Sequence, residues 1–87
     1  MDWQPEATEL FTELISLVPE PRRGYMANDV WRKAEMLAVN QGSTVVGREE
    51  LVAAYLRTIH PDLKVAAERH LEERGINIRL WDRYTLA

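Results

Sequence analysis

The chain has 87 residues, of which 46% are hydrophobic and 29% are charged, and its formal net charge is −3. This balance predicts one folded domain, 1–87, because a core of this size buries only about 60 to 65% of the surface of the unfolded chain and neither half would be stable alone. The absence of cysteine excludes disulfides, thiolate metal sites and cysteine nucleophiles, and the net negative charge weighs against nucleic acid as a partner.

The first ten residues, MDWQPEATEL, are acidic and polar, and no part of the sequence approaches eighteen consecutive apolar residues. The start therefore lacks the basic and apolar regions of a secretory signal. The apolar runs are too short for a membrane span. We expect a cytoplasmic protein with no membrane span.

Residues 5–18, PEATELFTELISLV, are predicted to form an amphipathic helix. Pro5 suits the first helical position, and Trp3 is expected to pack back onto the apolar side. The stretch VPEPRRG holds two prolines and a glycine, which predicts the end of the helix and a short connection. The apolar stripe recurs at intervals of three and four residues and comprises Ala7, Leu10, Phe11, Leu14, Leu17 and Val18.

A second helix is predicted from about Tyr25 to Gln41, with Gly42 as a left-handed C-terminal cap. Its buried stripe is expected to comprise Ala27, Val30, Trp31, Ala34, Leu37 and Ala38. The β-branched residues STVV that follow should be extended. A third helix over GREELVAAYLRTI, with Gly47 as its N-cap, is expected to bury Leu51, Val52, Tyr55, Leu56 and Ile59.

A fourth, weaker helix is predicted from Asp62 to Arg74, ending at Gly75 and burying Leu63, Ala67 and Leu71. The tail INIRLWDRYTLA alternates apolar and polar residues with a strand-like period. We expect it to form an extended C-terminal arm with Trp81 and Tyr84 as anchors. The predicted fold class is all-α, a compact bundle of about four helices with a short extended segment between the second and third helices.

Over roughly residues 1–56 the chain follows the residue order of a known family. A tryptophan precedes a Pro-Glu-Ala helix start, a proline and an arginine lie in the connection, a Glu-x-x-Ala-x-x-x-Gly sequence ends the next helix, and an apolar pair precedes an acidic helix start. These residues are Trp3, Pro5, Glu6 and Ala7, then Pro19 or Pro21 with Arg22, then Glu35, Ala38 and Gly42, then Val45, Val46 and Glu49.

This order resembles the small helical domain at the C-terminus of the catalytic subunit of light-independent protochlorophyllide reductase, a domain that also occurs as short free-standing proteins. The resemblance implies an accessory module associated with that nitrogenase-like enzyme, or with another tetrapyrrole or photosynthetic assembly. It does not imply catalysis, because in that enzyme the iron–sulfur clusters and the substrate pocket belong to the larger domains.

The order of helix, extended segment and helix around AVNQGSTVVGREEL also resembles half of a histone fold, in which short extended loops pair across a dimer. This likeness concerns the fold and carries little about function. It supplies the alternative hypothesis of a dimerising or DNA-binding module, which would bind duplex in a salt-sensitive way and form an interface between the second helices of two copies.

No pattern in the sequence predicts catalysis, since G-x-S-x-G, a phosphate-binding glycine loop and H-E-x-x-H are all missing. An axial ligand to a tetrapyrrole would need His60 or His70 in an apolar pocket, and surface histidines are the simpler interpretation. We therefore expect no enzyme, no metal and no cofactor, and a bound tetrapyrrole is the less favoured alternative.

Candidate partner-binding residues lie on the second helix and in the tail. Advancing about 100° per residue from Ala34, at the centre of the buried stripe, places Met36 and Val39 on the polar side near Arg32. Such a strip suits another protein or a second copy of the chain, although isolated exposed apolar residues are common, and the tail could also cover it.

A local basic excess adjoins this strip and suits phosphates or an acidic patch on a protein partner, or is an ordinary solvated surface. It consists of Arg22, Arg23, Arg32 and Lys33, next to Tyr25. The complete candidate set is Met36, Val39, Arg32, Arg22, Arg23, Tyr25, Trp81 and Tyr84.

Overall fold

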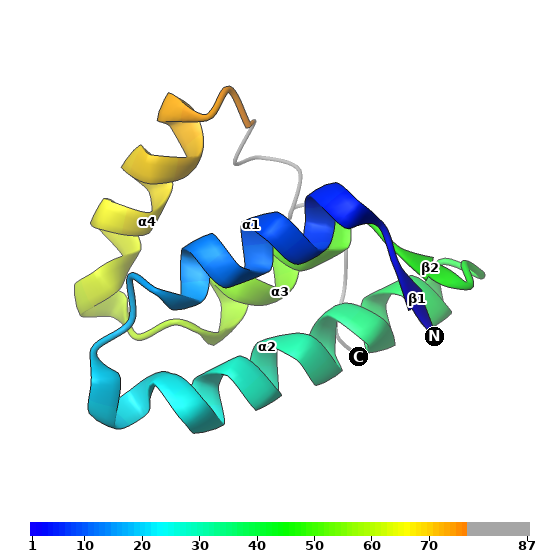
Figure 1. The fold of residues 1–87 in the computed structure, drawn as a ribbon, viewed down its shortest axis with the longest axis horizontal. Helices are drawn as coiled ribbons and strands as arrows, with labels where there is room; N and C mark the ends of the chain where they lie inside the picture. The colour runs from blue at the N-terminus through cyan, green and yellow to red at the C-terminus, as the bar shows by residue number, and fades with distance from the viewer. Residues whose placement is uncertain (77–87) are drawn as a thin grey trace.

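The computed structural model describes residues 1–76. Their elements are, in order, β1 (Asp2–Trp3), α1 (Pro5–Ile15), α2 (Glu20–Asn40), β2 (Val45–Val46), α3 (Arg48–Thr58) and α4 (Pro61–Glu73). The predicted all-α class with four helices is confirmed for these residues. In Figure 1, α1 and α3 lie along the same side of α2, and α4 stands at the end of the fold away from the two strands. The predicted C-terminal arm, with Trp81 and Tyr84, lies outside the described residues.

The central helix is α3, which packs against both α1 and α2. Its six consecutive residues from Leu51 to Leu56 are all buried, as expected for a helix that is covered on every side. The five residues predicted to be buried here are indeed in the core. The burial of Ala53 and Ala54 was not predicted, because a single apolar stripe accounts for only one covered face.

The predicted boundary between the first two helices is wrong. The helix α1 ends at Ile15, and α2 begins at Glu20, five residues before the predicted start at Tyr25. Pro21 stands within the first two positions of α2, where a helix needs no backbone N–H. The prolines therefore start a helix here rather than separating two of them.

This shift changes the core at both helix ends. Leu17, predicted in the apolar stripe, lies beyond α1 and is 42% exposed, whereas Ile15 is buried. In α2 the buried residues are Met26, Val30, Ala34, Leu37 and Ala38. Ala27 and Trp31, also predicted in that stripe, are only partly buried.

The predicted extended segment forms β2, which pairs in parallel with β1. The register sets Asp2 beside Val45 and Trp3 beside Val46. The sequence did not predict this pairing, because β1 has only two residues and shows no periodicity of its own. The pairing joins the N-terminal strand to the segment that directly precedes α3.

The two glycines predicted at helix C-termini are confirmed there. Gly42 and Gly75 each have a φ of 75°, a conformation that glycine adopts without steric cost. After α2, the N–H of Gly42 donates to the carbonyl of Val39 and the N–H of Ser43 donates to that of Ala38, both at 2.9 Å. These are the two hydrogen bonds of a Schellman motif.

The helix α4 contributes Ala67 and Leu71 to the core, as predicted, while Leu63 is only half-buried. Polar contacts attach it to the rest of the fold. The carboxylate of Glu13 in α1 pairs with His70 and with Arg74, the latter at 3.2 Å. A glutamate on α1 thus holds the C-terminal half of α4.

Candidate functional site

One face of α2 carries apolar side chains that contribute nothing to the core. Tyr25, Met36 and Val39 are 66%, 41% and 60% exposed. Together with Asp29 and Arg32 they recur at intervals of four, three, four and three residues, so they share one side of the helix. We call these five residues the outer stripe.

The outer stripe lies on the side of α2 opposite Ala34, which is fully buried. Figure 1 shows α2 along one border of the fold, with α1 and α3 on the same side of it. Met36 and Val39 therefore lie on the exposed side predicted from the helical period. Their role in binding a partner stays a prediction.

The middle of the outer stripe is an ion pair. The Arg32 Nη2 donates to Asp29 Oδ1 at 2.7 Å, and the Lys33 Nζ lies 3.3 Å from Asp29 Oδ2. The hydrogen bond from Arg32 is the main cause that lowers the pKa of Asp29. Asp29 is thus held in its charged form, and the predicted basic excess is partly neutralised here.

The other two candidate arginines have partners within the chain. The Arg23 Nε donates to the carbonyl of Val18 at 3.1 Å, which ties the start of α2 to the loop that follows α1. Arg22 pairs with Asp62 of α4 at 3.7 Å. Both contacts are structural, so of the basic residues proposed for partner binding only Arg32 belongs to the outer stripe.

An aromatic cluster borders the outer stripe. The rings of Trp3 and Trp31 are stacked, with centroids 3.8 Å apart, and Phe11 meets both rings edge-on. The Trp3 Nε1 donates to Glu35 Oε2 at 3.1 Å. Trp3 therefore packs back onto α1, as predicted, and also onto α2, which was not predicted.

A shallow hollow of about 520 Å³ connects this cluster to the outer stripe, and its lining consists of Tyr25, Asn28, Asp29, Trp31, Arg32 and Glu35. The sequence reasoning did not include Asn28, Trp31 or Glu35 among the candidate site residues. Trp31 fits the apolar stripe of α2, so the helical period alone predicts that it is a core residue. Its partial exposure depends on the position of the Trp3 ring, which the period of α2 does not show.

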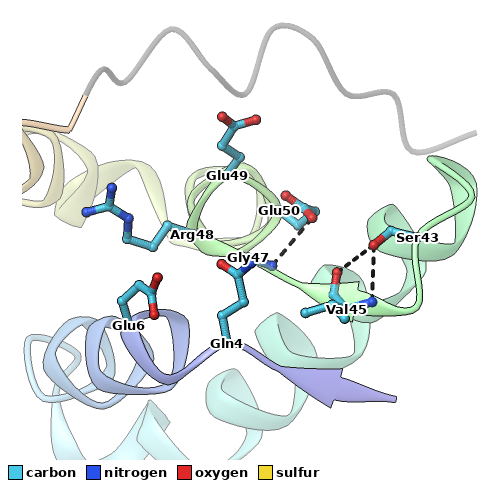
Figure 2. Close-up of a pocket in the computed structure, with 8 residues that line it drawn as sticks. All are labelled: Gln4, Glu6, Ser43, Val45, Gly47, Arg48, Glu49 and Glu50. Carbon is cyan, nitrogen blue, oxygen red and sulfur yellow. Dashed lines mark hydrogen bonds between the residues drawn. The ribbon is translucent and has the colours of Figure 1, made fainter.

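A second hollow lies at the start of α3, where the two strands meet the helices (Figure 2), and its lining comprises Gln4, Glu6, Ser43, Val45, Gly47, Arg48, Glu49 and Glu50. Its polar groups make local contacts. The Ser43 Oγ accepts from the Val45 N–H at 3.1 Å and donates to the Val45 carbonyl at 2.9 Å.

At the same hollow, Glu50 Oε1 accepts from the N–H of Gly47 at 3.4 Å (Figure 2). Because glycine has no side chain, only this half of a capping box forms. A Cβ on Gly47 would lie 3.1 Å from Gln4 Oε1, so a larger residue here would require the Gln4 side chain to shift. These contacts build the junction between the strands and α3, and they suggest no reaction.

The two histidines contact carboxylates. The Nδ1 of His60, at the start of α4, lies 2.7 Å from Asp62 Oδ1, and the Nε2 of His70 contacts Glu13. Among residues 1–76, no group of three or more histidine, aspartate and glutamate side chains could hold a metal ion. No helix in the same range is long and apolar enough to cross a membrane.

No protein-family model, no curated protein and no solved structure matches this chain. Its function is therefore inferred from its own residues and their arrangement.

Proposed function

We propose that this chain is a non-catalytic, cytoplasmic interaction module that binds a protein partner through the outer stripe of α2. One observation carries this proposal. Three large apolar side chains, between 41% and 66% exposed, share one face of the longest of the described helices, opposite its buried side.

The residue types support a contact surface. Single exposed apolar residues are common and need no explanation, as for Leu17 and Val65, which belong to different segments of the fold. In the outer stripe the apolar residues are gathered on one face. Tyrosine, methionine and arginine are enriched in protein interfaces, and methionine adapts to irregular surfaces.

The family resemblance names one candidate partner, a nitrogenase-like protochlorophyllide reductase or a related photosynthetic assembly. This candidate rests on the resemblance alone. Two of the residues behind the resemblance, Trp3 and Glu35, hydrogen-bond to each other, and Gly42 caps α2. These residues build the fold and lie outside the outer stripe, so they say more about architecture than about partners.

The histone-like alternative receives less support. That hypothesis predicts a contact between the α2 helices of two copies, and it also needs the extended segment after α2 to pair with the same segment of another copy. In this chain β2 already pairs with β1 along one edge. We therefore place the interaction on the outer stripe rather than on the extended segment.

Affinity capture from a cell extract tests the proposed surface. The tagged wild-type chain is compared with a Met36→Glu, Val39→Glu double variant. A matched control, Leu17→Glu with Val65→Glu, adds the same charge at apolar positions that are 42% and 68% exposed. We expect the wild type and the control to retain the same protein and the stripe variant to lose it at least about tenfold, the effect of about 1.4 kcal/mol in binding.

Thermal unfolding of each variant shows whether it is folded. Equal capture by the wild type and the folded stripe variant would contradict the proposal, as would equal loss in the control. Capture of a nitrogenase-like reductase, dependent on the stripe, would support the partner named by the resemblance.

A further inference from the structure

The outer stripe has the spacing of a coiled-coil seam. Positions 25, 29, 32, 36 and 39 alternate steps of four and three residues, as the a and d positions of a heptad repeat do. The seam lies opposite the buried Ala34, and α2 itself runs along one border of the fold (Figure 1). A second helix of matching chemistry could therefore lie along it.

The stripe is complementary to itself when a second copy of α2 runs antiparallel. A two-fold axis between residues 30 and 31 sets Tyr25 opposite Met36 of the second copy, and Asp29 opposite Arg32 of the second copy. By symmetry each pair occurs twice, as a two-fold interface requires. Sulfur packs favourably at an aromatic ring, and an arginine with a carboxylate makes a strong charged hydrogen bond.

Other arrangements lack this match. A parallel pair in register would set Asp29 opposite Asp29 and Arg32 opposite Arg32. Within the stripe, moving the antiparallel axis by half a heptad one way sets Asp29 against Val39, and moving it the other way sets Asp29 against Tyr25. Like charges or unpaired charges at a contact are costly, so the charges on the stripe select one antiparallel register.

We propose that the partner of the outer stripe is a second copy of this chain, bound through an antiparallel contact between the two α2 helices in that register. This inference rests on the proposed function and names its partner. The Asp29 carboxylate contacts Arg32 and Lys33 in the same chain through different oxygens. In the dimer each Asp29 then lies between its own Arg32 and that of the second copy.

The contact is short. From Tyr25 to Met36 the helix rises about 16 Å, at about 1.5 Å per residue. A helix pair of this length buries less surface than a standard stable interface. The dimer is therefore weak, and the fraction of chains in it depends on their concentration.

A charge exchange between two variants tests the register. In Asp29→Arg both positions 29 and 32 are basic, and in Arg32→Asp both are acidic. Each variant alone places like charges opposite each other, whereas a mixture of the two places opposite charges at every charged pair. Both positions are at the surface of α2, so circular dichroism is expected to show folded chains.

Sedimentation equilibrium measures association of the wild type, of each variant and of an equimolar mixture in which one variant carries a label. We expect a wild-type dimer, at least about tenfold weaker self-association for each variant, a loss of at least about 1.4 kcal/mol, and a mixed dimer of near wild-type affinity. This pattern would establish the antiparallel contact.

Three results would overturn the inference. A wild-type chain that stays monomeric up to about 1 mM, where binding of about 4 kcal/mol would be detected, rules out the second copy. Undiminished self-association of either variant places the dimer contact elsewhere, and failure of the mixture to associate rules out the register. The capture experiment with Met36→Glu and Val39→Glu still decides separately whether the stripe binds a different protein.

Discussion

At the scale of single residues, Tyr55 joins two helices from inside the core. Its side chain is among the largest fully buried ones, at 1% exposure. Its hydroxyl donates to the carbonyl of Leu14 at 3.1 Å, so a residue of α3 satisfies a polar group near the end of α1. Burial raises the pKa of Tyr55 to about 12.

We expect Tyr55→Phe to lower the free energy of unfolding by about 1 kcal/mol, the net contribution of a typical internal hydrogen bond. Urea denaturation at neutral pH measures this change. Tyr25→Phe is the control, because its side chain is 66% exposed and its replacement is expected to have no effect. A neutral result for Tyr55→Phe would mean that the hydroxyl contributes nothing to joining the two helices.

The same tyrosine predicts how stability changes in alkali. A tyrosine in the unfolded chain ionises near pH 10, whereas the folded chain holds this proton until about pH 12. The unfolded state therefore binds fewer protons above pH 10, and stability falls as the pH rises from 10 to 12, by about 2 to 3 kcal/mol in total. The phenylalanine variant should lack this part of the loss, and equal pH profiles of the two proteins would contradict the prediction.

At the scale of elements, helical periodicity predicted four helices at the right places and most of their buried residues. The prediction of helix boundaries failed at proline, whose effect depends on its position in a helix. Proline ends a helix in its interior but suits its first turn, and VPEPRRG contains prolines that satisfy the second condition. The strand β1 was not predicted because two residues, Asp2 and Trp3, show no period, and their pairing depends on where β2 lies in the folded chain.

Two glycines associated with α2 test its corrected boundaries. Gly24 lies inside the helix, and a Cβ there would meet no other atom within 4 Å. We expect Gly24→Ala to raise the free energy of unfolding by about 0.5 to 1 kcal/mol. If Gly24 were instead in an irregular connection, as the sequence alone predicted, no such gain would follow.

At Gly42, just beyond α2, we expect alanine to lower the free energy of unfolding, because the φ of this residue is 75°. An alanine there is strained, because its Cβ clashes in the left-handed region, and we expect Gly42→Ala to cost about 1 kcal/mol. Thermal unfolding of the two alanine variants measures the change in stability at each position. Changes of the same sign at the two positions would contradict the helix boundaries described here.

At the scale of the whole molecule, some residues of the candidate site can be predicted from helical periodicity, and others depend on contacts outside the helix. The exposed positions of Met36 and Val39 follow from the period of α2 alone. The role of Arg22 depends on Asp62, which comes near α2 only in the folded chain, and the role of Arg23 depends on how the short connection turns, because its Nε donates to the Val18 carbonyl. Contacts outside α2 therefore decide which of the predicted residues are available to a partner.

The N-terminal segment makes long-range contacts of its own, because β1 pairs with β2 and Trp3 packs on α2. We expect Trp3→Ala to lower the free energy of unfolding by about 2 to 3 kcal/mol. This is less than the cost of removing a fully buried tryptophan, because Trp3 is only partly buried. It would lose the stacking on Trp31, the edge contact with Phe11 and the hydrogen bond to Glu35 together.

Two further variants separate these contributions in urea denaturation followed by circular dichroism. Trp3→Phe keeps an aromatic ring but no donor, so it should cost about 1 kcal/mol more than Glu35→Gln, which keeps an acceptor for Trp3. If Trp3→Ala cost no more than Glu35→Gln, the strand pair would not belong to the cooperative fold. The helices alone would then hold α2 in place, and with it the outer stripe.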